Sequence, residues 1–200
     1  MKRYFGLFFL LFFFFSLWTA AMDEAAAEAL PEKLLRLRVV AESDEEPRQA
    51  EKLLARDAVL AALGPLLEDC GGLPSAEAVT AEALPDLAAA AGEALRAAGR
   101  ETAVTLRLGK TACPLRSYGG FTLPAGEYES LTVTLGAGEG RSWWCVVFPP
   151  LCPAAAGEEE ADAWAVFSPG ERRLLTSEGA EIRFRALEVL KKLRGWFSVG

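Results

Sequence analysis

Histidine is absent from all 200 residues, and this absence excludes several classes of chemistry. Histidine is the side chain that most often serves as a general base, and it is the commonest ligand of bound metals. Sites of the Ser-His-Asp and Cys-His types therefore cannot form within this chain, and a cysteine nucleophile would have no histidine to activate it. We predict no catalytic residue and no cofactor.

Cysteine is scarce, and the four cysteines lack the short C-x₂₋₄-C spacing that is typical of a zinc site, so no metal site is predicted. Cys145 and Cys152 flank two consecutive prolines, which must end a strand. A turn there would bring the two thiols together, and outside the cytoplasm they are able to oxidise. We therefore expect a Cys145–Cys152 disulfide. Two free cysteines, or a pair formed by Cys70 and Cys113, are the alternatives.

Positive charge is also in deficit, with 21 Lys and Arg against 28 Asp and Glu and a net charge of −7. An acidic protein repels phosphate backbones, so nucleic acid is not an expected partner. The glycine-rich segment 136–140 lacks the lysine-serine pair and the following helix of a phosphate-binding loop. It lies between two strand-like segments, so we expect a hairpin connection there.

The N-terminus carries the longest apolar run of the sequence. Lys2 and Arg3 precede an uncharged run from Tyr4 to Met22, which is the pattern of a secretory signal. The run is almost long enough to span a bilayer, so residues 1–22 are either a signal peptide or an uncleaved membrane anchor. Both alternatives leave the basic end inside and deliver the rest of the chain across the membrane.

Hydrophobic periodicity predicts an α+β protein with one small exported domain. Leu35, Leu37 and Val39 alternate with arginines as in a strand, and further strands are expected over 102–109, 128–135 and 143–148, forming a mostly antiparallel sheet. A capping box of Ser43 and Glu46 should start a helix from about residue 45 that stops at Gly64-Pro65. Its expected buried stripe is Ala50, Leu53, Leu54, Ala58, Ala61 and Ala62, beside a solvated basic ridge of Arg48, Lys52 and Arg56.

The remaining segments complete this organisation. A short helix capped by Ser75 should break or kink at Pro85 and be followed by a second helix ending at Gly99. We expect a linker over 23–32, the domain over 33–153, an acidic linker over 154–180 and an amphipathic helix over 181–200. That helix would either pack on the domain or lie on an anionic membrane surface.

Three segments, taken together, resemble the stage II sporulation protein R family of endospore-forming bacteria. They are LRLRVVAESDEEPRQAEKLLARDAVL (35–60), SYGGFTLPAGEYESLTVTLGAGEG (117–140) and WWCVVFPPLC (143–152), in the order and spacing of the family. The chain departs from the family pattern at Arg38, where histidine is common, and at Glu42, where asparagine is common.

The resemblance implies a signalling protein and not an enzyme. Such proteins are made in the forespore and secreted across its membrane into the intermembrane space. There they activate a membrane-embedded aspartic protease, which processes the sigma factor E precursor in the mother cell. The expected partner is that protease, and the N-terminal segment would add membrane contact if it is not cleaved.

Several aromatic and polar residues are the candidates for contacting this partner, since aromatic side chains often carry interface energy. The candidates are Ser43, Asp44, Tyr118, Glu127, Tyr128, Trp143 and Trp144. The alternatives are that at least one of Trp143 and Trp144 belongs to the core, and that Glu127 and Asp44 serve in turns or caps. Two alternative functions remain: a structural envelope protein anchored by residues 4–22, and a hydrolase that uses Asp44 with Glu127 or Glu129 as paired carboxylates.

Overall fold

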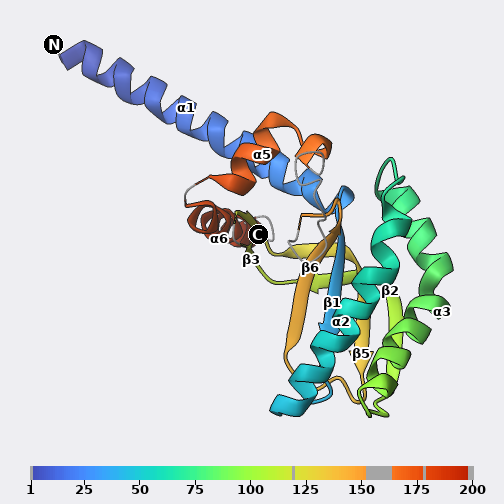
Figure 1. The fold of residues 1–200 in the computed structure, drawn as a ribbon. Helices are drawn as coiled ribbons and strands as arrows, with labels where there is room; N and C mark the ends of the chain where they lie inside the picture. The colour runs from blue at the N-terminus through green and yellow to red at the C-terminus, as the bar shows by residue number, and fades with distance from the viewer. Residues whose placement is uncertain (1, 119, 152–163, 178, 198–200) are drawn as a thin grey trace. The chain divides into compact units, whose positions relative to one another are not determined.

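The computed structural model describes residues 2–118, 120–151, 164–177 and 179–197 (Figure 1). The chain forms two compact units. We call Pro31–Cys113 with Gly126–Val166 the sheet unit, and Met1–Leu30, Pro114–Ala125 and Phe167–Gly200 the terminal unit. Residues 114–125, which lie within the range predicted as the domain, are grouped with the two ends of the chain.

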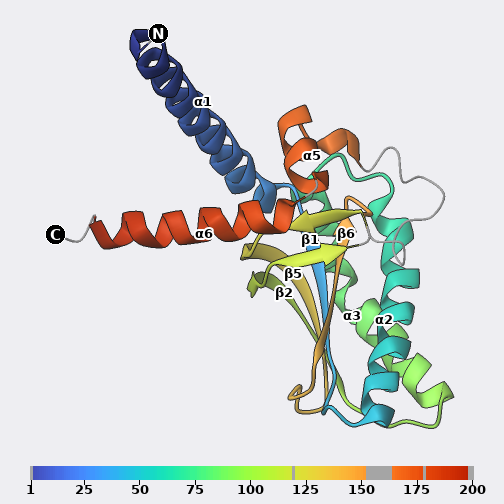
Figure 2. The same cartoon turned by 90° about the vertical axis from the view of Figure 1, so that its left-hand side faces the viewer.

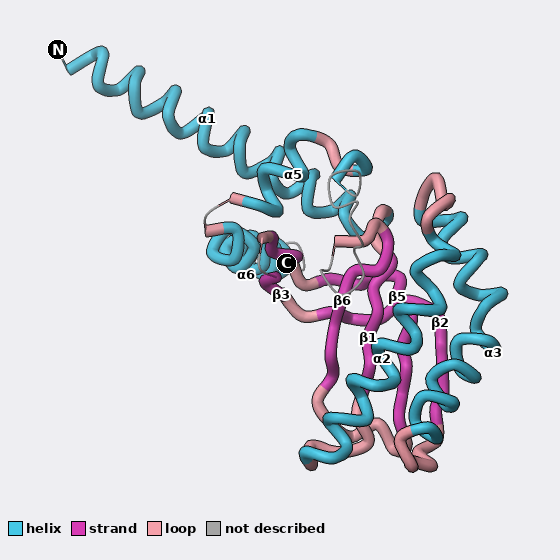
Figure 3. Tube along the Cα trace, viewed as in Figure 1, coloured by secondary structure: helices cyan, strands magenta, loops and turns pink. Residues whose placement is uncertain are grey.

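The sheet unit has four strands and two long helices, coloured by type in Figure 3. The strands pair in the order β2-β5-β1-β6, with β1 parallel to β5 and the other two pairs antiparallel. The predicted α+β class with a mostly antiparallel sheet is confirmed. The elements are β1 (Leu35–Val40), α2 (Glu46–Leu67), α3 (Leu73–Ala97), β2 (Val104–Cys113), β5 (Gly126–Leu135), β6 (Ser142–Phe148) and the short η2 (Trp164–Val166).

The core lies between the sheet and the two helices, which both pack on the same face of it (Figure 2). Leu37 pairs in register with Leu131 and Val39 with Val133, and all four side chains are fully buried. Since side chains alternate along a strand, these residues share one face of the sheet. Each buried aliphatic side chain stabilises the fold by about 1.5–3 kcal/mol relative to an exposed one.

Both helices continue through the prolines at which we expected them to stop or bend. Helix α2 runs past Gly64-Pro65 to Leu67, and α3 contains Pro85 within one continuous helix. A proline inside a helix costs about 3 kcal/mol, but buried residues on both sides hold these turns against the core. In α2 these residues are Leu63 and Leu67; in α3 they are Ala83 and Leu87.

The predicted start of α2 near residue 45 is confirmed, but the predicted capping box of Ser43 and Glu46 and the predicted buried stripe were wrong. Glu45 is the N-cap and makes no side-chain cap, while Ser43 Oγ accepts a bond from the Glu45 N–H. Leu53 and Leu54 are each 40% exposed. The buried positions are instead spaced four residues apart, at Ala55, Val59 and Leu63, a spacing that equally fits one helical face. Gly72, and not Ser75, is the N-cap of α3.

The glycine-rich segment 136–140 does not form a hairpin, because β5 and β6 lie on opposite sides of β1. The loop instead crosses the end of β1 and bonds to the segment that follows it. The Gly140 N–H donates to the Ala41 carbonyl at 2.9 Å, and the Glu139 N–H to the Glu42 carbonyl at 3.1 Å. A Cβ atom on Gly140 would collide with the Ser43 carbonyl, so this crossing requires glycine.

The terminal unit joins the two ends of the chain to a small hairpin. It contains α1 (Lys2–Ala29), β3 (Arg116–Tyr118), β4 (Phe121–Leu123), α5 (Pro169–Thr176) and α6 (Ala180–Phe197), with η1 (Leu30–Glu32) at its boundary. Helices α5 and α6 both contact β4. Within the part of the chain that the structure describes, no helix meets the length and hydropathy of a membrane span.

Helix α5 lies inside the segment that we expected to be a linker. Its N-terminus is a complete capping box: the Glu171 N–H donates to Ser168 Oγ, and the Ser168 N–H donates to the Glu171 carboxylate at 2.7 Å. The Ser-x-x-Glu pattern that predicts a helix start was therefore present in the sequence at residues 168–171. The predicted C-terminal helix is confirmed as α6, which buries Phe184 and leaves Ile182 74% exposed.

Candidate interaction surface

The two adjacent tryptophans of β6 point to opposite faces of the sheet. Trp144 lies on the face away from α2 and α3, paired in register with Arg38. Its ring has the Arg36 guanidinium 5.2 Å from the ring centroid and the Arg38 guanidinium 5.0 Å from it. Each such cation–π contact contributes about 0.5–2 kcal/mol, depending on how dry it is. With 8% of its surface exposed, Trp144 is buried against these two arginines.

Arg36 is completely buried in the centre of the sheet. Its guanidinium also lies 5.1 Å from the centroid of the Tyr128 ring. The buried thiol of Cys113 is nearby, with Sγ 3.9 Å from Ser130 Oγ. Burial raises the pKa of Cys113, and the neighbouring Arg36 charge partly opposes this rise.

Trp143 lies on the helix-covered face, where Arg56 from α2 stands 4.9 Å from its ring centroid. Arg56 thus belongs to a basic ridge that packs against the sheet and is not simply solvated. Lys52 is 7% exposed, and its ammonium donates to Gln49 Oε1 at 2.6 Å and to the Arg141 carbonyl at 3.1 Å. Burial, followed by the Arg141 charge, lowers the pKa of Lys52.

Ser43 and Asp44 tie the end of β1 to the crossing loop. Asp44 Oδ1 accepts the Arg141 N–H at 2.7 Å and also faces Arg141 Nε at 3.3 Å. The Ser43 carbonyl accepts a bond from Gln49 Nε2 at 2.8 Å. These bonds give both residues a structural role at the junction, and their role as partner contacts stays a prediction.

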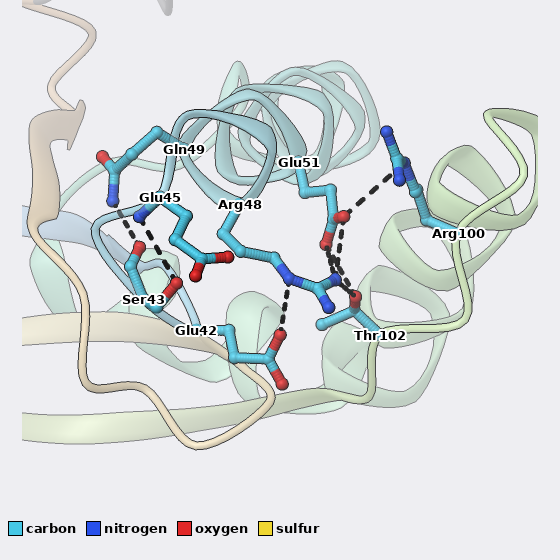
Figure 4. Close-up of polar contacts among 8 residues, drawn as sticks. All are labelled: Glu42, Ser43, Glu45, Arg48, Gln49, Glu51, Arg100 and Thr102. Atoms are coloured by element: carbon cyan, nitrogen blue, oxygen red, sulfur yellow. Dashed lines mark hydrogen bonds and ion pairs between the residues drawn. The ribbon is translucent and has the colours of Figure 1, made fainter.

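An ion-pair network around Glu51 anchors α2 beside this junction (Figure 4). The Glu51 carboxylate is 1% exposed and accepts from Arg48 at 3.0 Å and from Thr102 Oγ1 at 2.6 Å. Arg48 also pairs with Glu42 at 2.9 Å, and Arg100 lies 3.6 Å from Glu51. The hydrogen bond and charge of Glu51 raise the pKa of Arg48. The network joins the segments before α2 and after α3.

The remaining candidates are Tyr118, Glu127 and Tyr128. Tyr118 belongs to the terminal unit, where it stacks on Phe121 at 4.8 Å. Glu127 is exposed and Tyr128 is buried at the start of β5, whereas Asp44 follows the end of the parallel strand β1. Within the sheet unit, the structure brings Tyr128 and Trp144 to the same buried arginine, Arg36, and places Ser43 and Asp44 after the other end of β1. The role of all seven candidates as partner contacts stays a prediction.

The cysteines divide into two states. Cys145 is disulfide-bonded, whereas Cys70 and Cys113 are free. Cys152 lies outside the described residues, so its pairing with Cys145 stays a prediction.

The described residues contain no cluster of three metal-ligating side chains. The paired-carboxylate arrangement is not formed either. Glu129 pairs with Leu35 at the start of β1, and Val40 lies five residues further along that strand. Asp44 comes after Val40 in the chain. At about 3.3 Å per residue this places Asp44 more than about 15 Å from Glu129, well beyond the spacing of a glycosidase pair. The burial of Glu129 and, next, the Glu77 carboxylate raise the pKa of Glu129.

The sequence reasoning missed the arginines that organise the face away from the helices. Arg36 and Arg38 alternate with leucine and valine in β1, which identified the strand but not the environment of each arginine. The same alternation in VTLRLG of β2 places Arg107 on that face, in register with Thr132. Aligning the arginines of the two strands would have pointed to this surface.

Comparison with known proteins agrees with the resemblance seen in the sequence. The family model described as stage II sporulation protein R matches residues 31–158. The chain is 37% identical over 134 residues to the stage II sporulation protein R of Bacillus subtilis (strain 168). That match covers 67% of this chain and 60% of the relative, so the chain spans less than two thirds of the relative's length. No solved structure matches the chain. The chain belongs to the stage II sporulation protein R family.

Proposed function

We propose that this protein is an exported sporulation signal that activates a membrane-embedded aspartic protease, which then processes the sigma factor E precursor in the mother cell. The observation that carries the proposal is membership of the stage II sporulation protein R family across residues 31–158. The protein acts by binding and not by catalysis. It binds one state of the protease more tightly than the other, because a ligand without that difference would shift no population.

The N-terminal segment supports delivery across the forespore membrane to the intermembrane space. Lys2 and Arg3 precede the apolar run, and helix α1 exposes large apolar side chains that include Phe8, Leu11 and Trp18. Apolar side chains exposed along a helix favour a lipid environment over water. Residues 4–22 act as a signal peptide or as an anchor, and mass spectrometry of the exported protein distinguishes these: a fragment that retains Met1 identifies the anchor.

Co-expression tests the activity directly. The full-length chain, the candidate protease and the sigma factor E precursor are produced together in a bacterium that does not sporulate, and precursor cleavage is followed by immunoblotting. We expect cleavage only when all three proteins are present and when the chain retains residues 1–22. A chain that is exported and folded but leaves the precursor intact would refute the proposal.

A further inference from the structure

The face of the sheet away from α2 and α3 has an unusual charge distribution. In the four strands of the sheet unit the only acidic residues are Glu127 and Glu129, which are paired in register with Ala112 and Lys110. Alternation places both glutamates on the helix-covered face, opposite in direction to Tyr128 and Arg36. The other face carries arginines and no carboxylate from the strands, although the whole chain has a net charge of −7. We call this the arginine face.

A row of paired residues crosses the arginine face from one edge strand to the other. The register links Trp144 of β6 to Arg38 of β1, Arg38 to Thr132 of β5, and Thr132 to Arg107 of β2. The hydroxyl-bearing Thr134 and Thr105 form part of the next row. The row thus presents two guanidinium groups separated by one hydroxyl.

Both guanidinium groups in this row are available to a ligand. Arg107 is exposed and Arg38 is partly exposed, and neither forms an ion pair with any described residue. Arg38 is held in place by Trp144 and by its Nε–H, which donates to Ser142 Oγ at 3.0 Å. A pre-oriented arginine loses less side-chain freedom when it binds a carboxylate, which favours binding.

We propose that the arginine face binds an extracytoplasmic acidic segment of the partner protein, through carboxylates that pair with Arg38 and Arg107. Neighbouring strands are about 4.8 Å apart, so the two arginines, which are two strands apart, select carboxylates about 10 Å apart. We infer an acidic ligand from charge complementarity, because an acidic segment is attracted to the arginine face and repelled by the rest of this acidic protein. This difference would orient the two proteins when they bind. The inference rests on the proposed function, because the partner is the protease that the protein activates.

Charge reversal at Arg107 tests the proposal in the three-component assay. Arg107→Glu removes an exposed side chain that makes no described contact, so folding should be retained. Arg96→Glu on α3 is the matched control, since it changes the net charge equally at another exposed arginine. We expect the amount of protein needed for half-maximal cleavage to rise about tenfold for Arg107→Glu and to change less than about twofold for Arg96→Glu. Arg107→Lys, which keeps the charge, should retain most of the activity.

Crosslinking supplies a readout independent of cleavage. A photoreactive phenylalanine analogue at Thr105, on the arginine face, should crosslink to the protease, whereas the same analogue at Glu93 of α3 should not. Equal activity of Arg107→Glu and Arg96→Glu, or crosslinking of Thr105 to a second copy of this chain alone, would overturn the inference while leaving the proposed function intact. Failure of the wild-type chain to induce any cleavage would instead refute the proposed function, and with it this assignment of the partner.

Discussion

Substitution of Gly140 by alanine should destabilise the protein where the crossing loop touches the segment that follows β1. The new Cβ atom would collide with the Ser43 carbonyl, which is backbone and cannot rotate away. Overpacking of this kind costs about 1–3 kcal/mol. Separating the two segments would also weaken the bonds from the Gly140 and Glu139 N–H groups, and each is worth about 1 kcal/mol. We expect a total loss of about 3 kcal/mol.

Thermal unfolding of the full-length chain, followed by far-ultraviolet circular dichroism, measures this loss. For a chain of this size a change of about 3 kcal/mol lowers Tm by about 6–12 °C. Gly71→Ala is the control, because a Cβ atom on Gly71 meets nothing within 4 Å and its φ is not positive. That substitution should leave Tm unchanged or slightly raised, since alanine restricts the unfolded chain. If Gly140→Ala and Gly71→Ala unfold at the same temperature, the close crossing at β1 does not exist in solution.

Three further predictions concern side chains of the sheet unit. Trp144→Ala should lower the free energy of unfolding by about 3–5 kcal/mol. Trp143→Ala should lower it clearly less, because Trp143 is only half-buried. Unfolding of the two variants in urea measures both free energies. Glu129→Gln should raise Tm near pH 7, because a carboxyl group whose pKa is raised by folding destabilises the folded state when it is ionised. The difference in Tm between the variant and the wild type should vanish as the pH falls through the folded-state pKa of Glu129. Cys70 should react with a thiol reagent in the folded protein, whereas Cys113 should react only after denaturation.

The strands were predictable because their two faces differ in polarity. Leu35, Leu37 and Val39 define β1, and the apolar residues of β5 alternate in the same way. Strand order was not predictable, because β6 could pair with β5 through a short hairpin or with β1 across the loop, and both arrangements satisfy the same alternation. The close crossing at Gly140 decides between them, and it depends on residues nearly 100 positions apart.

The effect of the two prolines on the helices was mispredicted, because local sequence does not reveal tertiary packing. Pro65 and Pro85 oppose a helix locally, but packing of the buried residues on both sides of each proline offsets that cost. Burial of Glu51 and Lys52 was equally hidden, since charged residues are buried only when partners satisfy them. Those partners, Thr102 and the Arg141 carbonyl, come from distant segments that local periodicity does not reveal.

The two arginines of β1 have different environments, although they lie on the same strand. Arg36 and Arg38 are two residues apart and share a face, yet Arg36 is fully buried and Arg38 is partly exposed. Burying a guanidinium is costly, and an apolar side chain of similar size would often be at least as stable there. Arg36 lies against the ring of Trp144, and that ring in turn positions Arg38 beside the solvent. Trp144 thus contacts both the buried and the partly exposed arginine, so a change at Trp144 should disturb both.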